Sequence, residues 1–267
     1  MTSKVVLITG ASSGIGLATA ELLHEAGFIV YGTSRRTNNA SKYKFHLIEL
    51  DVNHDDSVNH AVEKVLENEG RIDVLINNAG FAIAPAGAEE SSMQQAQAIF
   101  DTNFFGAVRM TRAVLPVMRE QKSGLILNIS SILGLLPTPF GALYSASKHA
   151  LEGYSESLDH ELRSQGIRVS LIEPAYTKTS LGINLLEADA KVSAYDHIRE
   201  KLHQHMIKAI NKSDDPSVVA KTILTVINSQ NILPRYTSGK AARHLKNLRK
   251  FAPVKIFDTL IQRSLKV

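Results

Sequence analysis

Near the start of the chain stands Thr9-Gly10-Ala11-Ser12-Ser13-Gly14-Ile15-Gly16, a loop between an apolar strand predicted over residues 4–9 and an amphipathic helix predicted over residues 14–26. Its glycines follow the pattern G-x-x-x-G-x-G. Glycine permits tight turning and lets a pyrophosphate approach the backbone, and the next helix points free N–H groups at such an anion. The loop therefore predicts a phosphate site, with an ordinary glycine-rich turn as the alternative. The residues expected at the phosphates are Gly10, Ser12, Ser13, Gly14, Ile15 and Gly16.

The rest of the chain alternates strands and helices, which is typical of a parallel sheet covered by helices on both faces. Strands are predicted at residues 28–33, 45–50, 72–76, 125–129 and 167–172, and helices at 56–69, 89–121, 143–165 and about 214–228. We expect residues 178–212 to form a helical lid over the substrate and residues 239–267 to form a basic helical tail. No repeat or linker divides the chain. Residues 1–267 are therefore predicted to form a single doubly wound, Rossmann-type α/β domain.

The composition excludes several classes of protein. Of the 267 residues, 44% are hydrophobic, and no stretch of about 18 apolar residues predicts a membrane-spanning helix. There is no cysteine, which excludes disulfides, thiolate metal sites and a cysteine nucleophile and fits a cytoplasmic location. The histidines show no metal-ligand spacing, so we expect no metal.

Four more motifs follow the glycine loop: Asn77-Asn78-Ala79-Gly80, Asn103-Phe104-Phe105-Gly106, Asn128-Ile129-Ser130-Ser131 and Tyr144-Ser145-Ala146-Ser147-Lys148. Together with the glycine loop they resemble the short-chain dehydrogenase/reductase family over residues 4–180. The resemblance implies a seven-stranded sheet, a nicotinamide cofactor, and hydride transfer between that cofactor and a carbonyl or alcohol. It also implies a homodimer or homotetramer in which helices around 101–121 and 143–165 pair across a two-fold axis.

Tyr144 and Lys148 lie four residues apart on a predicted helix, so their side chains share one face. Because an ammonium group favours a nearby phenolate, we expect Lys148 to lower the pKa of Tyr144 and make it an effective general acid/base. On its own, such a pair is more typical of an exposed helix surface. By the resemblance, Ser131 binds the substrate oxygen, Lys148 also binds the nicotinamide ribose, and Asn103 holds a water near the lysine. A purely structural role is the alternative for Asn103.

The end of the second strand bears on the choice of cofactor. NAD-preferring relatives usually carry an acid where this chain has Ser34, and here Arg35 and Arg36 follow. Because guanidinium groups suit the geometry and charge of a phosphate, we expect NADP(H). Two solvated loop arginines are the alternative. The resemblance implies further cofactor contacts at Asp51, Val52, Asn78, Ala79, Gly80, Tyr144, Lys148, Pro174, Thr177 and Thr179. A simple cap at the end of the third strand is the alternative for Asp51.

The loops expected over the nicotinamide are apolar, which predicts a hydrophobic ketone or secondary alcohol, such as a lipid-like, steroid-like or aromatic compound. These residues are Leu133, Leu135, Leu136, Pro137, Phe140, Tyr176, Leu181, Ile183, Leu185 and Leu186. The alternative function is that of a non-catalytic NADP(H)-binding regulatory protein of the same fold. The intact set of Ser131, Tyr144 and Lys148 argues against it. Relatives that epimerise sugar nucleotides usually have a different glycine pattern.

The family resemblance says least about the role of the C-terminal tail. Residues 235–267 carry nine Lys/Arg against one acid, Asp258, so this segment has a net charge of +8 and residues 1–234 one of −4. The overall charge is therefore no argument for nucleic-acid binding. Apolar residues at helical spacing in the tail allow two interpretations. The tail packs over the substrate pocket or a neighbouring subunit, or it lies on an anionic membrane. We expect the first, because apolar helix faces usually find protein.

Overall fold

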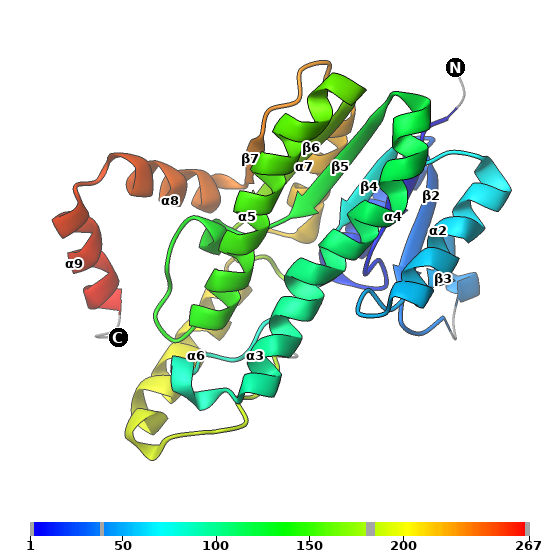
Figure 1. Ribbon diagram of the computed structural model, residues 1–267. Coiled ribbons are helices and arrows are strands. Elements are labelled where there is room, and N and C mark those ends of the chain that lie inside the picture. The colour runs from blue at the N-terminus through cyan, green and yellow to red at the C-terminus, as the bar shows by residue number, and fades with distance from the viewer. Residues whose placement is uncertain (1–2, 38–39, 180–184, 265–267) are drawn as a thin grey trace.

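The chain, described here by a computed structural model over residues 3–37, 40–179 and 185–264, contains one parallel sheet (Figure 1). Its strands are β1 (Val5–Ile8), β2 (Ile29–Ser34), β3 (His46–Glu49), β4 (Val74–Asn77), β5 (Gly124–Ile129), β6 (Ile167–Pro174) and β7 (Arg235–Ser238). They lie in the order β3-β2-β1-β4-β5-β6-β7, which confirms the predicted seven-stranded, doubly wound sheet. The winding direction reverses between β1 and β4, the place where such sheets bind ligands.

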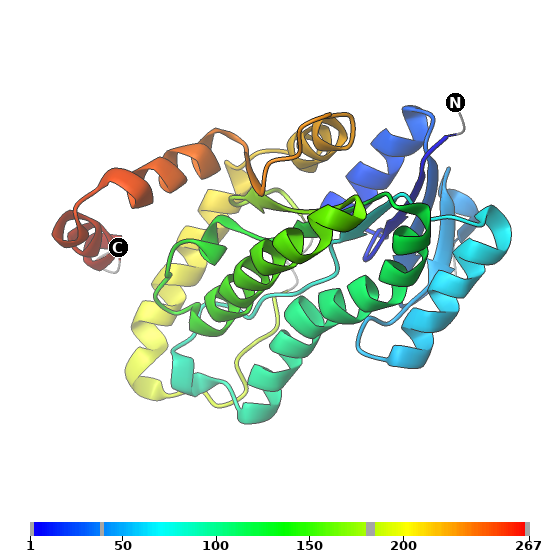
Figure 2. The ribbon, with the colours of Figure 1, turned by 45° about the horizontal axis from the view of Figure 1, so that its top comes forward.

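Helices cover both faces of the sheet (Figure 2). One face packs against α1 (Gly14–Glu25) and α7 (Pro216–Ile227), and the other against α2 (Asp55–Glu69), α4 (Gly106–Gln121) and α5 (Ala142–Leu162). Successive strand residues point to opposite faces. In β1, Val6 and Ile8 therefore join the core under α1 and α7, whereas Val5 and Leu7 join the core under the other three helices. A strand buried on both sides has no polar alternation, which explains the continuous apolar runs of the sequence.

The helix predicted over residues 89–121 is divided into three parts. It begins as α3 (Met93–Phe100), where the Ser92 side chain accepts a hydrogen bond from the backbone N–H of Gln95. A wide, π-helical segment, Asp101–Phe105, follows and leads into α4. Such segments occur often at functional sites because they re-aim side chains. Here the segment carries Asn103 into the protein interior.

The predicted lid and tail are both helical. Within residues 178–212 the structure has α6 (Asp196–Asn211), and residues 180–184 lie outside the described ranges. The tail consists of α8 (Lys240–Phe251) and α9 (Val254–Ser264), which are separated at Pro253. Both views show these two helices projecting from the body beyond β7 (Figures 1 and 2). None of the helices in the described ranges is long and apolar enough to cross a bilayer.

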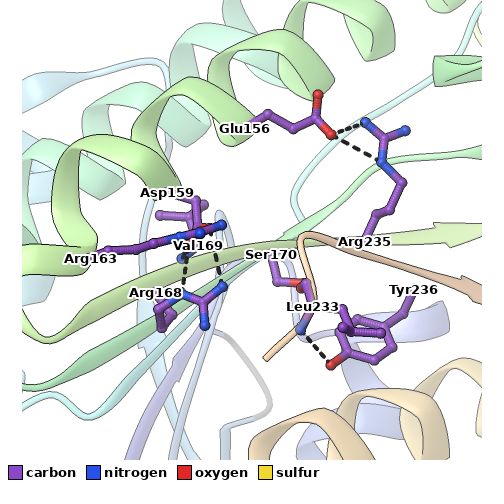
Figure 3. A network of polar contacts seen from close by, with 9 residues as sticks. All are labelled: Glu156, Asp159, Arg163, Arg168, Val169, Ser170, Leu233, Arg235 and Tyr236. Carbon is purple, nitrogen blue, oxygen red and sulfur yellow. Dashed lines mark hydrogen bonds and ion pairs between the residues drawn. The ribbon is translucent and has the colours of Figure 1, made fainter. Parts of the chain in front are cut away.

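A buried carboxylate fixes α5 against β6 (Figure 3). Asp159 accepts hydrogen bonds from Arg168, from the backbone N–H of Val169 and from Arg163. Burial alone would raise the pKa of Asp159, but these three donors hold it below its ordinary value. Since α5 also carries Tyr144 and Lys148, this anchor helps to position both side chains at the edge of the sheet.

Candidate active site

A cavity of about 1590 Å³ opens at the carboxyl ends of the strands, where the winding of the sheet reverses. It extends from the glycine loop after β1 to α6 and the tail. Most residues predicted for the site line it: Gly10, Ser12, Ser13, Gly14, Ile15, Ser34, Arg35, Arg36, Asp51, Val52, Asn78, Ala79, Gly80, Ser131, Tyr144, Lys148, Pro174, Thr177 and Thr179. Two predicted residues, Gly16 and Asn103, do not line it. The structure thus brings predicted residues that are far apart in the sequence, from Gly10 to Thr179, around one cavity.

The glycine loop has the backbone that a pyrophosphate site requires. Gly10 and Gly14 have φ angles of 67° and 58°, in the left-handed region that favours glycine. Ser13, the N-cap of α1, makes no side-chain capping bond, and the first turn contains no acid. The free N–H groups of that turn therefore remain for an anion, so the residues present fit the pyrophosphate of a dinucleotide.

Gly16 has a packing role in the glycine loop. A Cβ atom at this position would lie 2.3 Å from the carbonyl oxygen of Gly10 and 2.6 Å from Nδ2 of Asn78. The third glycine of the motif therefore allows the first turn of α1 to approach the loop closely. Gly16 does not line the cavity, and its predicted contact with the cofactor stays a prediction.

Asn78 and Ala79 fasten the glycine loop to the end of β4. The backbone N–H groups of both residues donate to Oγ1 of Thr9, each at 2.9 Å. Nδ2 of Asn78 donates to the carbonyl oxygens of Thr9 and Gly10, at 2.9 and 3.0 Å. These four bonds fix the shape of the cavity floor.

The arginine pair lines the cavity directly after the end of β2. Oγ of Ser34 accepts a bond from the backbone N–H of Arg36 at 3.3 Å, and the side chains of Arg35 and Arg36 are exposed. Asp51 lines the same region, but its Oδ1 also accepts from the backbone N–H of Asn53 at 3.0 Å. Asp51 therefore stabilises a local turn as well as lining the cavity.

Helix α5 and the loop after β5 present the three catalytic candidates on one wall. Nζ of Lys148 donates to the carbonyl oxygen of Ile129 at 2.8 Å and lies 5.8 Å from the ring centroid of Tyr144. Oγ of Ser131 accepts from the backbone N–H of Leu133 at 3.1 Å, which caps the short 3₁₀ turn Ile132–Gly134. Tyr144 and Lys148 therefore share one face of α5, as predicted, and the Ser131 hydroxyl contacts Tyr144 on the same wall.

The prediction that Lys148 lowers the pKa of Tyr144 is wrong for the protein without a bound cofactor. Burial raises the pKa of Tyr144 to about 12 and the charge of Tyr176 adds to the increase, while a hydrogen bond from Ser131 opposes it. Burial also lowers the pKa of Lys148 to about 8, against the opposing effect of Glu152. Both shifts have one cause, because a site that excludes water disfavours each charged form.

Asn103 is held by the protein on all sides of its amide. Its Nδ2 donates to the carbonyl oxygen of Phe81 at 2.9 Å and to Oγ of Ser147 at 3.2 Å, and its Oδ1 accepts from the N–H of Phe81 at 2.9 Å. A Cβ atom on Gly80 would lie 2.9 Å from Oδ1 of Asn103 and 3.9 Å from Nζ of Lys148. Asn103 therefore lies next to the lysine, outside the lining of the large cavity, and its amide is bonded to protein groups, while its role in holding a water near Lys148 stays a prediction.

A buried charge cluster behind Lys148 was missed by the sequence analysis. Nη1 of Arg235 lies 3.3 Å from Oε2 of Glu152 and 3.2 Å from Oε1 of Glu173, and the same guanidinium binds Glu156 (Figure 3). Burial raises the pKa of Glu152 to about 7; Ser130 and Arg235 act in the opposite direction, whereas Glu173 reinforces it. The available indication was the spacing, because Glu152 continues the row of Tyr144 and Lys148 at four-residue intervals.

The other end of the cavity is apolar, as predicted. The expected residues that line it are Leu133, Leu136, Pro137, Phe140, Tyr176, Leu185 and Leu186. Leu135 instead packs in a cluster with Phe257 and Leu245 of the tail. Leu181 and Ile183 lie outside the described residues. The sequence analysis missed lining residues from α6 and the tail, which are Leu202, His205, Met206, Ala209, Ile210, Leu245 and Ile261.

Comparisons with known proteins agree with this site. Residues 4–190 match the short chain dehydrogenase family. A 3-ketodihydrosphingosine reductase from Bacteroides thetaiotaomicron is 47% identical over 189 residues, which cover 69% of this chain and 68% of that protein. YusZ of Bacillus subtilis, an uncharacterized oxidoreductase, is 34% identical over 281 residues and covers 99% of both chains.

Solved structures give the same result. A short chain dehydrogenase/reductase from Burkholderia phymatum in complex with NAD aligns with a TM-score of 0.81 at 25% identity, over 93% of each chain. ElxO with NADP bound aligns with a TM-score of 0.74 at 27% identity, over 89% of this chain and 97% of that one. The chain belongs to the short-chain dehydrogenase family and is an oxidoreductase with the nucleotide-binding fold of that family.

Proposed function

We propose that this protein reduces a hydrophobic ketone to a secondary alcohol with NADPH. The observation that carries the proposal is the shape and lining of one cavity. Its wall holds Ser131, Tyr144 and Lys148 together, its floor has a phosphate-binding backbone, and its far end is apolar. A ketone on a long aliphatic chain fits that far end. The Bacteroides relative is named for the reduction of 3-ketodihydrosphingosine, which supports a lipid-like substrate for this chain as well.

The geometry suggests a distinct task for each catalytic side chain. The nicotinamide supplies a hydride when it is bound. Burial holds Tyr144 in its neutral form, with a pKa of about 12, so its hydroxyl is a proton donor throughout the neutral range. Ser131 donates a hydrogen bond to the substrate oxygen, and the ammonium of Lys148 stabilises the phenolate that remains after Tyr144 has donated its proton.

The NADP preference rests on the loop after β2. Two exposed guanidinium groups, from Arg35 and Arg36, line the cavity next to Ser34, and a serine has no charge to repel a phosphate. Bidentate hydrogen bonds from arginine are the usual protein contact with a 2′-phosphate. Neighbouring structures contain NAD in one case and NADP in another, so this loop is the feature of the chain that favours NADP.

The activity is tested with a panel of ketones that differ in chain length, measured by the loss of NADPH absorbance. We expect kcat/KM to rise with the length of the aliphatic chain, because each buried methylene adds about 0.8 kcal/mol of favourable transfer free energy. Binding of NADPH without turnover of any ketone in the panel, or of the alcohols in the reverse direction, would favour the regulatory alternative.

The cofactor preference is tested by the double substitution Ser34→Asp and Arg35→Ala. We expect it to reverse the preference from NADPH to NADH, because the carboxylate binds the ribose diol and repels the 2′-phosphate. The single change Arg35→Ala is the control, since it removes a cation without adding an anion. Equal kcat/KM values for both cofactors in the unmodified protein would contradict the proposed role of the arginines.

A further inference from the structure

The tail uses only part of its apolar surface to contact the body. Phe257 is buried and Ile261 lines the cavity, one helical turn apart, and they pack with the loop that follows Ser131. Beside them on α9, Ile256 and Leu260 form a second row, also one turn apart, and these side chains are 53% and 38% exposed. At the junction of the two helices Phe251 and Val254 are 72% and 78% exposed. The packing expected for the tail is therefore present but leaves half of the apolar face uncovered.

This exposed apolar surface is unusual within the molecule. In the described ranges, ten large apolar side chains are strongly exposed, and four of them lie between residues 251 and 260. Single apolar side chains exposed here and there on a surface need no explanation, but a cluster of exposed apolar side chains marks a contact surface. The cluster lies on the part of the chain that projects farthest from the sheet (Figures 1 and 2).

Basic side chains lie on the same two helices as the exposed apolar cluster. Six basic side chains of α8 and α9 are exposed: Lys240, Arg243, Arg249, Lys250, Lys255 and Arg263. None of the six forms an ion pair with an acid in the part of the chain that the structure describes. Lys250 lies over the ring of Phe251 at 5.2 Å, and Arg249 lies over the ring of Phe257 at 4.7 Å. Two of these exposed cations thus lie directly against aromatic rings of the tail, one of them the exposed ring of Phe251.

We propose that α8 and α9 form a docking surface for an anionic lipid bilayer. Helices that lie in a membrane interface combine Lys and Arg with exposed Phe, Leu, Ile and Val, which insert below the headgroups while the cations contact lipid phosphates. A second copy of the tail is a poor occupant, because two surfaces of the same positive charge repel. Nucleic acid attracts the cations but offers no partner for four exposed aliphatic and aromatic side chains.

Docking places the cavity at the membrane. Leu245 of α8 and Ile261 of α9 line the cavity, and two residues of its wall, Tyr176 and Leu186, are 50% and 47% exposed. A hydrophobic substrate dissolved in the bilayer then reaches the site along apolar surface without crossing water. This consequence depends on the proposed function, whereas bilayer binding itself needs no substrate and is measured without turnover.

Co-sedimentation of the full chain with vesicles tests the proposal. We expect binding to vesicles of phosphatidylcholine mixed with phosphatidylglycerol at low salt, weak binding to phosphatidylcholine alone, and loss of binding near 1 M NaCl, where the Debye length falls to about 3 Å. The double change Arg243→Glu and Lys250→Glu is expected to weaken binding at least about thirty-fold, since each basic residue near the surface contributes about 1 kcal/mol. The control is Lys44→Glu with Lys64→Glu. This pair makes the same charge change just before β3 and on α2, which lie on the side of the molecule away from the tail (Figure 1).

A second pair of variants tests the apolar contribution. Phe251→Ser with Val254→Ser removes two side chains that hardly contact the body, so the fold and NADPH binding remain intact while vesicle binding falls. Met93→Ser with Leu233→Ser is the matched control, because these side chains are 73% and 55% exposed elsewhere. Three outcomes would overturn the proposal. The full chain does not bind the anionic vesicles, or each control pair weakens vesicle binding as much as its test pair does. In the third, the tail variants change only the oligomeric mass or DNA binding.

Discussion

Replacing Glu152 with glutamine tests how one buried carboxylate tunes Lys148. Glu152 lies one helical turn beyond Lys148 on α5, and its negative charge opposes the fall in the lysine pKa that burial causes. The substitution preserves volume. It also leaves Arg235 with two other carboxylate partners, Glu156 and Glu173, so we expect the fold to persist. Without the carboxylate, the pKa of Lys148 should fall below its value of about 8.

The size of the shift follows from the helix geometry. Side chains four residues apart on a helix are separated by about 6 Å. Two unit charges at about 6 Å, with an effective dielectric constant of about 20, interact by about 3 kcal/mol, which equals about two pH units. Glu152 has a pKa of about 7, so it is mostly ionised above pH 8 and this charge is present where Lys148 titrates. We therefore expect a decrease of between about one and two pH units.

The measurement is the pH profile of kcat/KM for ketone reduction. The ammonium form of Lys148 is the active form, so activity should fall as pH rises through the lysine pKa. In the Glu152→Gln variant this alkaline limb should move to lower pH. Glu156→Gln is the matched control, because Glu156 binds the same Arg235 one turn farther along and is 45% exposed, where solvent screens its charge.

Two outcomes would refute the reasoning. One is an alkaline limb at the same pH in the unmodified protein and in Glu152→Gln, which would mean that Lys148 does not control it. The other is an equal displacement in Glu156→Gln, which would mean that disturbance of Arg235, and not the charge beside Lys148, is responsible.

Three further predictions concern the reaction, the glycine loop and the assembly. Tyr144→Phe should lower kcat for reduction by about 10²- to 10⁴-fold with little change in the Kd of NADPH, because only the proton donor is lost; near-normal turnover would remove Tyr144 from the mechanism. Gly16→Ala should lower the free energy of unfolding by about 1–3 kcal/mol in urea titrations and weaken NADPH binding, since its Cβ meets backbone 2.3 Å away. Gly153→Ala, with nothing within 4 Å of its Cβ, is the control and should be neutral or stabilising. Light scattering should give the mass of a dimer or tetramer, with α4 and α5 at the interface; a single-chain mass at micromolar concentration would contradict this.

The sequence alone determined the features that depend on local spacing. The glycine loop between a strand and a helix required a tight turn that leaves helix N–H groups free, and the four-residue interval between Tyr144 and Lys148 required a shared helix face. Continuous apolar strands separated by amphipathic helices required a parallel sheet buried on both sides. These features follow from short-range geometry, and the structure has each of them.

Only the tertiary structure decided the features that depend on which distant segments meet. Arg235 of β7 approaches Glu152 of α5 and Glu173 of β6 because β7 pairs with β6 at the sheet edge, and no local pattern contains that contact. Burial, which sets the pKa values of Tyr144 and Lys148, likewise results from the whole fold and reversed the direction expected for the tyrosine. The same reason explains why the cavity includes residues of the tail, which begins at Lys240, far beyond the end of the catalytic helix at Leu162: the whole fold brings the apolar face of the tail to the active-site loop.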